Sequence, residues 1–263
     1  LSDKYKPGDA KRYVALRMHK HAELRVFELL GSLYGQKDAP VRWHNTLKTT
    51  LKHIGFKQSE NDVCLYSHTS KDIKLVVHVD DIMCRANKAD STWFWGTMQR
   101  RYALKAWDYV EAGKPQTYIG LTISKTAVRG DTYYGIDQNA DVDAFLQDYV
   151  QRGAAPVRAP MPNKHELHSS DEPADDNAQR WYRSALMSLS WFSIMTRPDL
   201  SHTVSRLAQQ MGSRSKGDKP TVSAVRALKR AVCYLLHRPH MTLFVRRSSG
   251  EDVLNHYVDS DHG

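Results

Sequence analysis

The sequence has few cysteines, no long hydrophobic run and no internal repeat. Its three cysteines, Cys64, Cys84 and Cys233, lie far apart, so neither a Cys-x-x-Cys zinc site nor a disulfide scaffold is indicated. This cysteine usage fits a reducing compartment. No stretch of about 18 apolar residues occurs, so a membrane-spanning helix is not expected. The lack of a low-complexity tract, with 41% apolar residues, argues against a disordered chain.

The length of 263 residues predicts one or two domains, at roughly 150 residues per domain. The sequence starts with Leu1 rather than Met and stops at Gly263, directly after an acidic cluster. No signal peptide precedes the first polar segment. We therefore expect this chain to be part of a longer protein.

Positive charge is in excess, with a formal net charge of +9. Residues 1–60 carry twelve Lys/Arg against six Asp/Glu, and residues 197–247 carry eleven against two. Between them, residues 163–179 carry five acidic residues and one lysine. The excess alone is compatible with simple solubility as well as with a polyanionic partner. Two basic blocks on either side of an acidic strip favour two surfaces that bind a phosphate backbone.

Hydrophobic periodicity predicts a mixture of helices and short strands. A helix should begin at Asp38-Ala39-Pro40, where Asp38 can cap and Pro40 suits the first turn, and end before Gly55. Four prolines and the acidic strip within 156–179 indicate a linker. Further helices are predicted over residues 88–104, 139–150, 180–195, 199–211 and 221–236, and strands over 62–67, 117–123, 132–136 and 253–259.

The adjacent carboxylates Asp80 and Asp81 are the sharpest chemical feature. They interrupt the apolar run of residues 74–84, which predicts a β-hairpin with the pair at or near its tip. Adjacent carboxylates repel each other and resist burial, and a divalent cation relieves both problems. Magnesium is usually held by one or two carboxylates plus substrate phosphates, and two such ions support phosphoryl transfer. A solvated Asp-Asp turn is the alternative, although it would need no apolar strands around it.

The segment of residues 33–40 is the second candidate site. Gly35 lets the backbone approach a ligand closely, and the N-terminus of the following helix offers free N–H groups to an anion. Lys37 adds a full positive charge. An ordinary loop that leads into a helix explains this motif equally well when it is taken alone.

Seven segments, in order along nearly the whole chain, resemble the reverse transcriptases of copia-type retrotransposons. Residues 32–43 resemble the family's SLYGLKQAPRxW segment, and residues 77–82 resemble its polymerase signature VYVDDI. The other matching segments are residues 55–66 (GFxxSxxDxCLY), 118–123 (YFLGIEI), 159–207, 227–235 (AxKRVLRYL) and 257–261 (YSDAD). One such motif has little specificity, whereas seven in the correct order are very specific.

The resemblance implies an α+β fold with the right-hand polymerase palm, an antiparallel sheet with helices, followed by a thumb and a helical connection. It implies an RNA-directed DNA polymerase that joins a dNTP to a primer 3′-hydroxyl. Mg²⁺ would be the cofactor, with Mn²⁺ as a substitute, and the partners would be an RNA template, a DNA primer and dNTP. The family is associated with cytoplasmic virus-like particles and the nucleus. The residues themselves indicate no membrane partner, and they indicate neither a location nor an oligomeric state.

The resemblance also assigns roles to residues. Asp80 and Asp81 would be the catalytic metal ligands, and Asp259 would match the first carboxylate of the ribonuclease H domain. The residues that would line the nucleotide and template site are Tyr34, Gly35, Gln36, Lys37, Ala39, Pro40, His78 and Lys105.

The same resemblance divides the chain into five segments. They are partial fingers and palm over residues 1–125, thumb over 126–160, an acidic linker over 161–180, a helical connection over 181–250 and the first ribonuclease H strand over 251–263.

Three departures from the family pattern predict little or no polymerase activity from this chain alone. No upstream catalytic aspartate is matched, because Leu1-Ser2 would be only the last trace of the segment that follows it. His78 stands where the family has Tyr or Phe, and the ribonuclease H domain is cut after its first strand.

Three alternatives remain open. The first is a catalytically dead retroelement remnant that only binds nucleic acid. The second is a basic scaffold for RNA or protein that is unrelated to polymerases, which would leave the order of the seven segments to coincidence. The third is a nuclease based on Asp259 and Asp261, which would require two further acidic residues.

Overall fold

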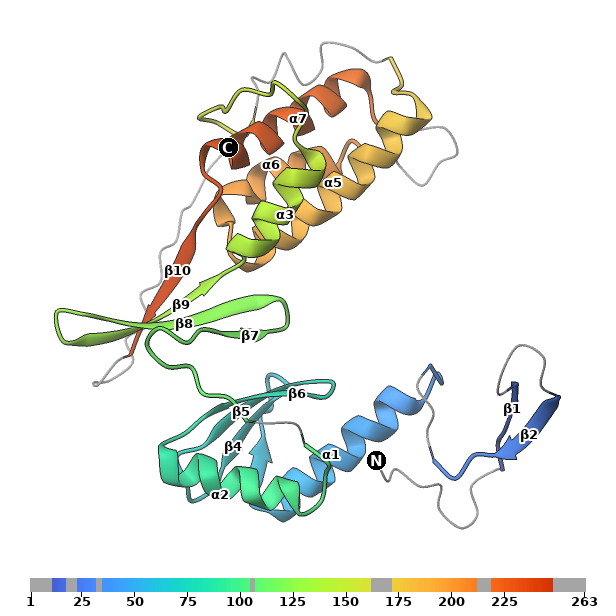
Figure 1. The fold of residues 1–263 in the computed structure, drawn as a ribbon, viewed down its shortest axis with the longest axis vertical. Helices are drawn as coiled ribbons and strands as arrows, with labels where there is room; N and C mark the ends of the chain where they lie inside the picture. The colour runs from blue at the N-terminus through green and yellow to red at the C-terminus, as the bar shows by residue number, and fades with distance from the viewer. Residues whose placement is uncertain are drawn as a thin grey trace. The chain divides into compact units, whose positions relative to one another are not determined.

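The computed structural model describes residues 11–17, 23–31, 35–104, 107–161, 172–211 and 219–247 (Figure 1). The chain divides into two compact units, residues 1–108 and 109–263, and each has its own hydrophobic core. None of the helices in the described residues is long and apolar enough to span a bilayer.

The first unit combines antiparallel strands with two helices. Strands β1 (Tyr13–Arg17) and β2 (Leu24–Glu28) form a separate hairpin. A four-stranded sheet has the order β3-β4-β5-β6, with every neighbouring pair antiparallel. Its strands are β3 (Phe56–Gln58), β4 (Leu65–His68), β5 (Lys74–His78) and β6 (Asp81–Arg85), and the helices are α1 (Ala39–His53) and α2 (Lys88–Gln99).

The core of the first unit lies between the sheet and both helices. Alternation along β5 buries Leu75 and Val77 and leaves Lys74 and His78 exposed. The helices contribute apolar side chains at helical spacing, among them Leu47 and Leu51 of α1 and Phe94 and Met98 of α2. One face of the sheet is therefore packed against helices, and the other carries the polar positions.

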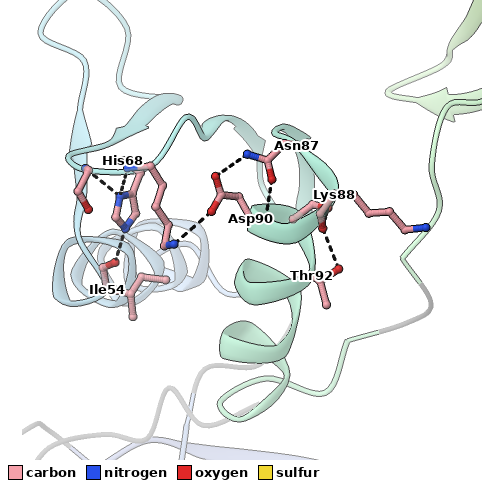
Figure 2. A network of polar contacts seen from close by, with 9 residues as sticks. Ile54, His68, Asn87, Lys88, Asp90 and Thr92 are labelled. Atoms are coloured by element: carbon pink, nitrogen blue, oxygen red, sulfur yellow. Dashed lines mark hydrogen bonds and ion pairs between the residues drawn. The ribbon is translucent and has the colours of Figure 1, made fainter.

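His68 at the end of β4 joins α1 to the sheet (Figure 2). Its Nδ1 accepts hydrogen bonds from the backbone N–H groups of Ser70 and Lys71, both at 3.1 Å. The ring proton therefore belongs on Nε2, which lies 3.1 Å from the carbonyl oxygen of Ile54 at the end of α1. Lys71 continues the network to Asp90 in the first turn of α2 at 3.1 Å, and this hydrogen bond lowers the pKa of Asp90.

The second unit contains another antiparallel sheet and a helical bundle. The sheet has the order β10-β9-β8-β7. Its strands are β7 (Gln116–Tyr118), β8 (Leu121–Val128), β9 (Asp131–Asp137) and β10 (Thr242–Arg246). The bundle consists of α3 (Asn139–Tyr149), α5 (Asp176–Met195), the short 3₁₀ helix η1 (Pro198–Leu200), α6 (Ser201–Ala208) and α7 (Val222–His237). Buried side chains of the helices form the core, and none of the sheet residues belongs to this cluster.

A buried arginine organises the junction between α5 and α6. Arg197 is 1% exposed, and its guanidinium donates two hydrogen bonds to Asp199, at 3.1 and 2.9 Å, and one to the carbonyl oxygen of Pro239 at 3.2 Å. The Tyr234 hydroxyl of α7 also donates to Asp199, at 2.8 Å. Burial opposes ionisation of Asp199, but the hydrogen bonds from Arg197 and Tyr234 outweigh it and hold its pKa below the ordinary value.

The described elements confirm a mixed fold of helices and antiparallel strands. The predicted helices are present, although α2 ends at Gln99 rather than at residue 104, and α5 begins at Asp176 inside the predicted linker. Strands β1, β2, β3 and β10 were not predicted, and the single strand predicted over 117–123 is wrong, because a turn at residues 119–120 separates β7 from β8. The predicted strand over 253–259 lies outside the described residues. Strand β8 crosses the proposed boundary between residues 125 and 126, and the functional names of the five segments stay predictions.

Replacing Gly55 with Ala should destabilise the first unit. Gly55 has φ +98°, and a Cβ there would lie 2.9 Å from Nε2 of His68. We expect a loss of about 2–3 kcal/mol, because the left-handed backbone costs about 1 kcal/mol and the histidine must give up its hydrogen bond. Gly35 is the matched control, with φ +91° and no atom within 4 Å of the added carbon. Equal losses in denaturant unfolding of the two Ala variants would contradict the role of His68.

The Asp199→Asn variant should destabilise the second unit by about 3 kcal/mol, because it leaves the Arg197 guanidinium buried without a counter-charge. The lowered pKa of Asp199 means that its ionisation stabilises the fold above about pH 4, the unfolded value. The difference between wild type and variant should therefore shrink as the pH falls below that value.

Lys219→Gln is the matched control, since its ion pair with Asp176 is exposed and contributes less than about 1 kcal/mol. Thermal unfolding at several pH values measures both variants. If the difference in stability between wild type and Asp199→Asn does not change as the pH falls below the unfolded pKa, the charge of Asp199 is not the cause of the destabilisation.

Candidate active site

Asp80 and Asp81 lie at the tip of the β5–β6 hairpin, as the sequence predicted. Val79 and Asp80 form the two-residue turn, and Asp81 begins β6 directly opposite His78 of β5. His78, Asp80 and Asp81 are exposed. Val77, next to His78 in β5, is buried in the core, so the exposed charged tip follows directly on a buried apolar part of the hairpin.

The register of the hairpin places His78 and Asp81 on the sheet face away from the core. The pairs Val77–Ile82 and Leu75–Cys84 alternate with the pairs His78–Asp81 and Val76–Met83. Leu75 and Val77 point to the helices, so His78 and Asp81 must point to the opposite face. A one-residue slip of this register would exchange the two faces.

The turn has an uncommon backbone conformation. Val79 has φ +53°, which a β-branched residue rarely adopts, and its side chain is 59% exposed. The indole N–H of Trp43, in the first turns of α1, donates a hydrogen bond to the carbonyl oxygen of Val79. This contact fixes the hairpin tip relative to the N-terminal part of α1 and helps to hold the strained residue in place.

The start of α1 is held by two arginines. Asp38 is the N-cap residue, and its carboxylate accepts hydrogen bonds from Arg12 at 2.7 Å and from Arg42 at 3.0 Å. The hydrogen bonds from Arg12 and Arg42 hold the pKa of Asp38 well below its usual range. Asp38 stands at the predicted N-cap position but makes no side-chain hydrogen bond to the helix backbone, so the predicted capping hydrogen bond is absent and the carboxylate binds the two arginines instead. Pro40 occupies the first turn, as predicted.

The loop before α1 is described only from Gly35 onward. Gly35 has φ +91°, and the carbonyl oxygen of Gln36 accepts a hydrogen bond from the Ala39 N–H at 3.2 Å. Lys37 and Pro40 are exposed. The predicted site residues Tyr34, Lys105 and Asp259 lie outside the described residues. The structure thus connects the Pro40 end of α1 to the carboxylate hairpin through Trp43, the last residue of the 32–43 segment, and nothing in the sequence indicated this hydrogen bond.

The donor atoms at the hairpin tip fit a hard divalent cation. Two exposed carboxylates supply oxygen ligands and leave room for the phosphate oxygens of a substrate. Among the described residues, no group of three or more His, Cys, Asp or Glu side chains is arranged to hold a metal ion. In the part of the chain that the structure describes, β6 is an edge of the four-stranded sheet, so its outer side can accept another strand.

Cys84 lies two residues beyond Ile82 on the core-facing side of β6 and is not part of this tip. Burial raises the pKa of its thiol to about 11, so the thiol stays protonated at neutral pH.

Comparison with known proteins shows which family of proteins this chain resembles. A family model described as reverse transcriptase (RNA-dependent DNA polymerase) matches residues 15–163. The putative transposon Ty5-1 protein of Saccharomyces cerevisiae is 27% identical over 248 residues, which cover 90% of this chain and 73% of that protein. The Pol polyprotein from transposon RE1 of Arabidopsis thaliana is 30% identical over 243 residues, again 90% of this chain but 15% of the polyprotein.

The Pol polyprotein from transposon TNT 1-94 of Nicotiana tabacum is 25% identical over 188 residues, 68% of this chain and 14% of the polyprotein. The matched region thus spans most of the yeast relative and about one seventh of the plant polyproteins. No solved structure matches the chain.

Replacing Val79 with Gly should stabilise the first unit by about 1 kcal/mol, because glycine adopts positive φ without steric cost. Val79→Ala keeps the Cβ and is the control, which should gain less. Denaturant unfolding measures both variants. A loss of stability in Val79→Gly would show that the valine side chain contributes more through its contacts than the backbone conformation costs.

Proposed function

Because the chain belongs to the reverse transcriptase family of copia-type retrotransposons, we propose that it provides the RNA-directed DNA polymerase site of such a Pol polyprotein. It joins a dNTP to the 3′-hydroxyl of a DNA primer along an RNA template and releases pyrophosphate. The observation that carries this proposal is the exposed Asp80–Asp81 pair at the tip of a hairpin with a buried apolar base.

The residues at the tip have distinct proposed roles. Asp80 in the turn and Asp81 at the start of β6 hold Mg²⁺, for which Mn²⁺ can substitute. When bound, the cation neutralises the charge that develops on the attacking and leaving oxygens. Asp81 faces His78 across the hairpin, so His78 lies where it can contact the primer end. Trp43 keeps the turn in one position, which preorganises both carboxylates.

The loop before α1 binds the nucleotide and the template in this proposal. Gly35 at positive φ and Gln36, Lys37 and Ala39 present backbone and one positive charge beside the helix start. Pro40 fixes the first turn of α1. Tyr34 and Lys105 are proposed to complete this site.

A third carboxylate completes the site when a strand pairs with the open edge of β6. Two-metal phosphoryl transfer is expected to need more than the two adjacent carboxylates, and no third one joins them among the described residues. Strand β6 is an edge strand, and its outward positions Asp81 and Met83 are exposed. A strand on this edge would add a side chain next to Asp81 on the same face.

The functional names of the other segments are part of the same proposal. Residues 1–125 contribute fingers and palm, 126–160 a thumb, 161–180 a linker and 181–250 a helical connection, and Asp259 opens a ribonuclease H domain. Virus-like particles in the cytoplasm, with access to the nucleus, are the corresponding location.

A chain that binds nucleic acid without catalysis is the second candidate. It is favoured by His78 in place of the family's aromatic residue and by the presence of only two carboxylates at the described site. Both candidates predict binding that weakens steeply with salt, because the chain carries a net charge of +9. Only the polymerase candidate predicts primer extension.

Primer extension on an RNA template with Mg²⁺ or Mn²⁺ tests the proposal. We expect little or no synthesis by residues 1–263 alone and clear synthesis by a longer polyprotein segment that adds the upstream strand. Asp80→Asn in the longer form should reduce the rate by at least about 10³-fold, because it removes a charge that balances the cation. Asp72→Asn is the matched control, since this exposed carboxylate pairs with Arg85 at the other end of β5 and β6.

Retained synthesis in the Asp80→Asn variant would contradict the assigned metal site. Synthesis by residues 1–263 alone would contradict the need for an added strand. If no form synthesises DNA and the chain still binds template–primer in a salt-sensitive way, the second candidate is favoured.

A further inference from the structure

The sheet of the second unit presents an aromatic face that the polymerase site does not use. Cross-strand pairs place Ser124, Gly135 and Phe244 in one row and Thr126, Tyr133 and Arg246 in the next. Residues directly opposite one another share a face, so Tyr133 and Phe244 are diagonal neighbours on one side of the sheet. Figure 1 shows β10 running along β9, with the β8–β9 turn at the end away from the helices.

Phe244 lies over a glycine and remains open to solvent. Its Cε1 atom is 3.3 Å from the position that a Cβ of Gly135 would occupy, so the ring covers the space left by the missing side chain. The side chain is nevertheless 60% exposed. A ring that rests on a glycine backbone with one side in solvent is a flat apolar surface of the size of a nucleobase, and the partly buried Tyr133 lies diagonally from it in the next row.

Arginines lie at the β8–β9 turn, where Arg246 shares the face of Phe244 and Arg247 follows it on the face of Val245. Arg129 stands in the turn, Arg246 ends β10, and the Arg247 N–H donates to the Thr132 carbonyl oxygen at 2.9 Å. All three arginines are exposed. One carboxylate, Asp131, accompanies them and pairs with Arg246 at 2.9 Å. Three positive charges against one negative charge give this end of the sheet a local charge of +2.

We propose that Phe244 and Tyr133, with the arginines at the β8–β9 turn, form a stacking platform for single-stranded nucleic acid. Aromatic faces bind successive bases without sequence preference, and nearby cations contact the phosphates. The excess of arginine over carboxylate selects a polyanion over an apolar peptide. The platform rests on the proposed role of the chain with nucleic acid, but it lies within the second unit and needs neither Asp80 nor a bound cation.

The opposite face of β10 supplies an internal control. Val245 is 56% exposed, close to the exposure of Phe244, but alternation along the strand directs it to the other face. Val245→Ala therefore removes a similar exposed apolar group from the same strand without touching the platform. Phe244→Leu removes the flat ring and keeps an apolar side chain over Gly135, and Phe244→Trp keeps a ring.

The test measures fluorescence anisotropy of labelled single-stranded RNA and DNA of about 12 nucleotides, within the range that single-strand-binding folds cover, with the full chain. Phe244→Leu should weaken binding of single strands about tenfold. Val245→Ala should leave the affinity unchanged, and Phe244→Trp should restore it. Arg246→Gln, on the same face as Phe244, should lower the slope of affinity against salt by about 0.7, the value for one phosphate contact on a single strand.

A 2-aminopurine base in the oligonucleotide reports stacking directly, because its emission falls when it stacks on a ring. We expect quenching with wild type and Phe244→Trp and less with Phe244→Leu. The comparison of RNA, DNA and a duplex of the same length shows which nucleic acid the platform accepts.

Equal affinity of wild type and Phe244→Leu for single strands, or no single-strand binding by wild type, would overturn the platform. Either result leaves the polymerase proposal intact, because primer extension depends on Asp80 in the first unit. Conversely, loss of binding in Phe244→Leu with no primer extension by any form would support the platform and contradict the polymerase.

Discussion

The first unit depends on one constraint, the two-residue period of the β5–β6 hairpin. Leu75 and Val77 must be buried against the helices, and this requirement alone turns His78 and Asp81 to the open face. The same pairing leaves two residues for the turn, which places Asp80 at the tip. Burial of apolar side chains thus fixes the face on which the charged ones lie, and the hydrogen bond from Trp43 then holds the turn in place.

The sequence predicted this hairpin because its two signals agree. The apolar run of residues 74–84 is bounded by polar residues, and the carboxylates interrupt it at a point where only a turn can accommodate them. Helices α1 and α7 were predictable for the same reason, since apolar spacing coincides with Pro40 at one start and Thr221 as the N-cap at the other. Where local preference and burial point to the same structure, a single sequence is sufficient.

Several of the missed features depend on contacts between residues that are far apart in the sequence. The bond from Trp43 to Val79 joins positions 36 residues apart, and the link from Arg197 to Pro239 spans 42. Strand β10 was missed because its partner β9 lies more than 100 residues earlier and its own exposed positions show no clear alternation. The positive φ of Val79 also has no local signal, because valine is a residue that avoids it.

Arg197 sets a lower limit on the length of chain that can fold as the second unit. Its buried guanidinium finds its acceptors on Asp199 beside it and on Pro239 beyond α7. A truncation before residue 239 would bury that charge with an acceptor missing and would also remove β10 from the edge of β9. Domain boundaries drawn for expression or for polyprotein dissection therefore have to keep residues 197–246 in one piece.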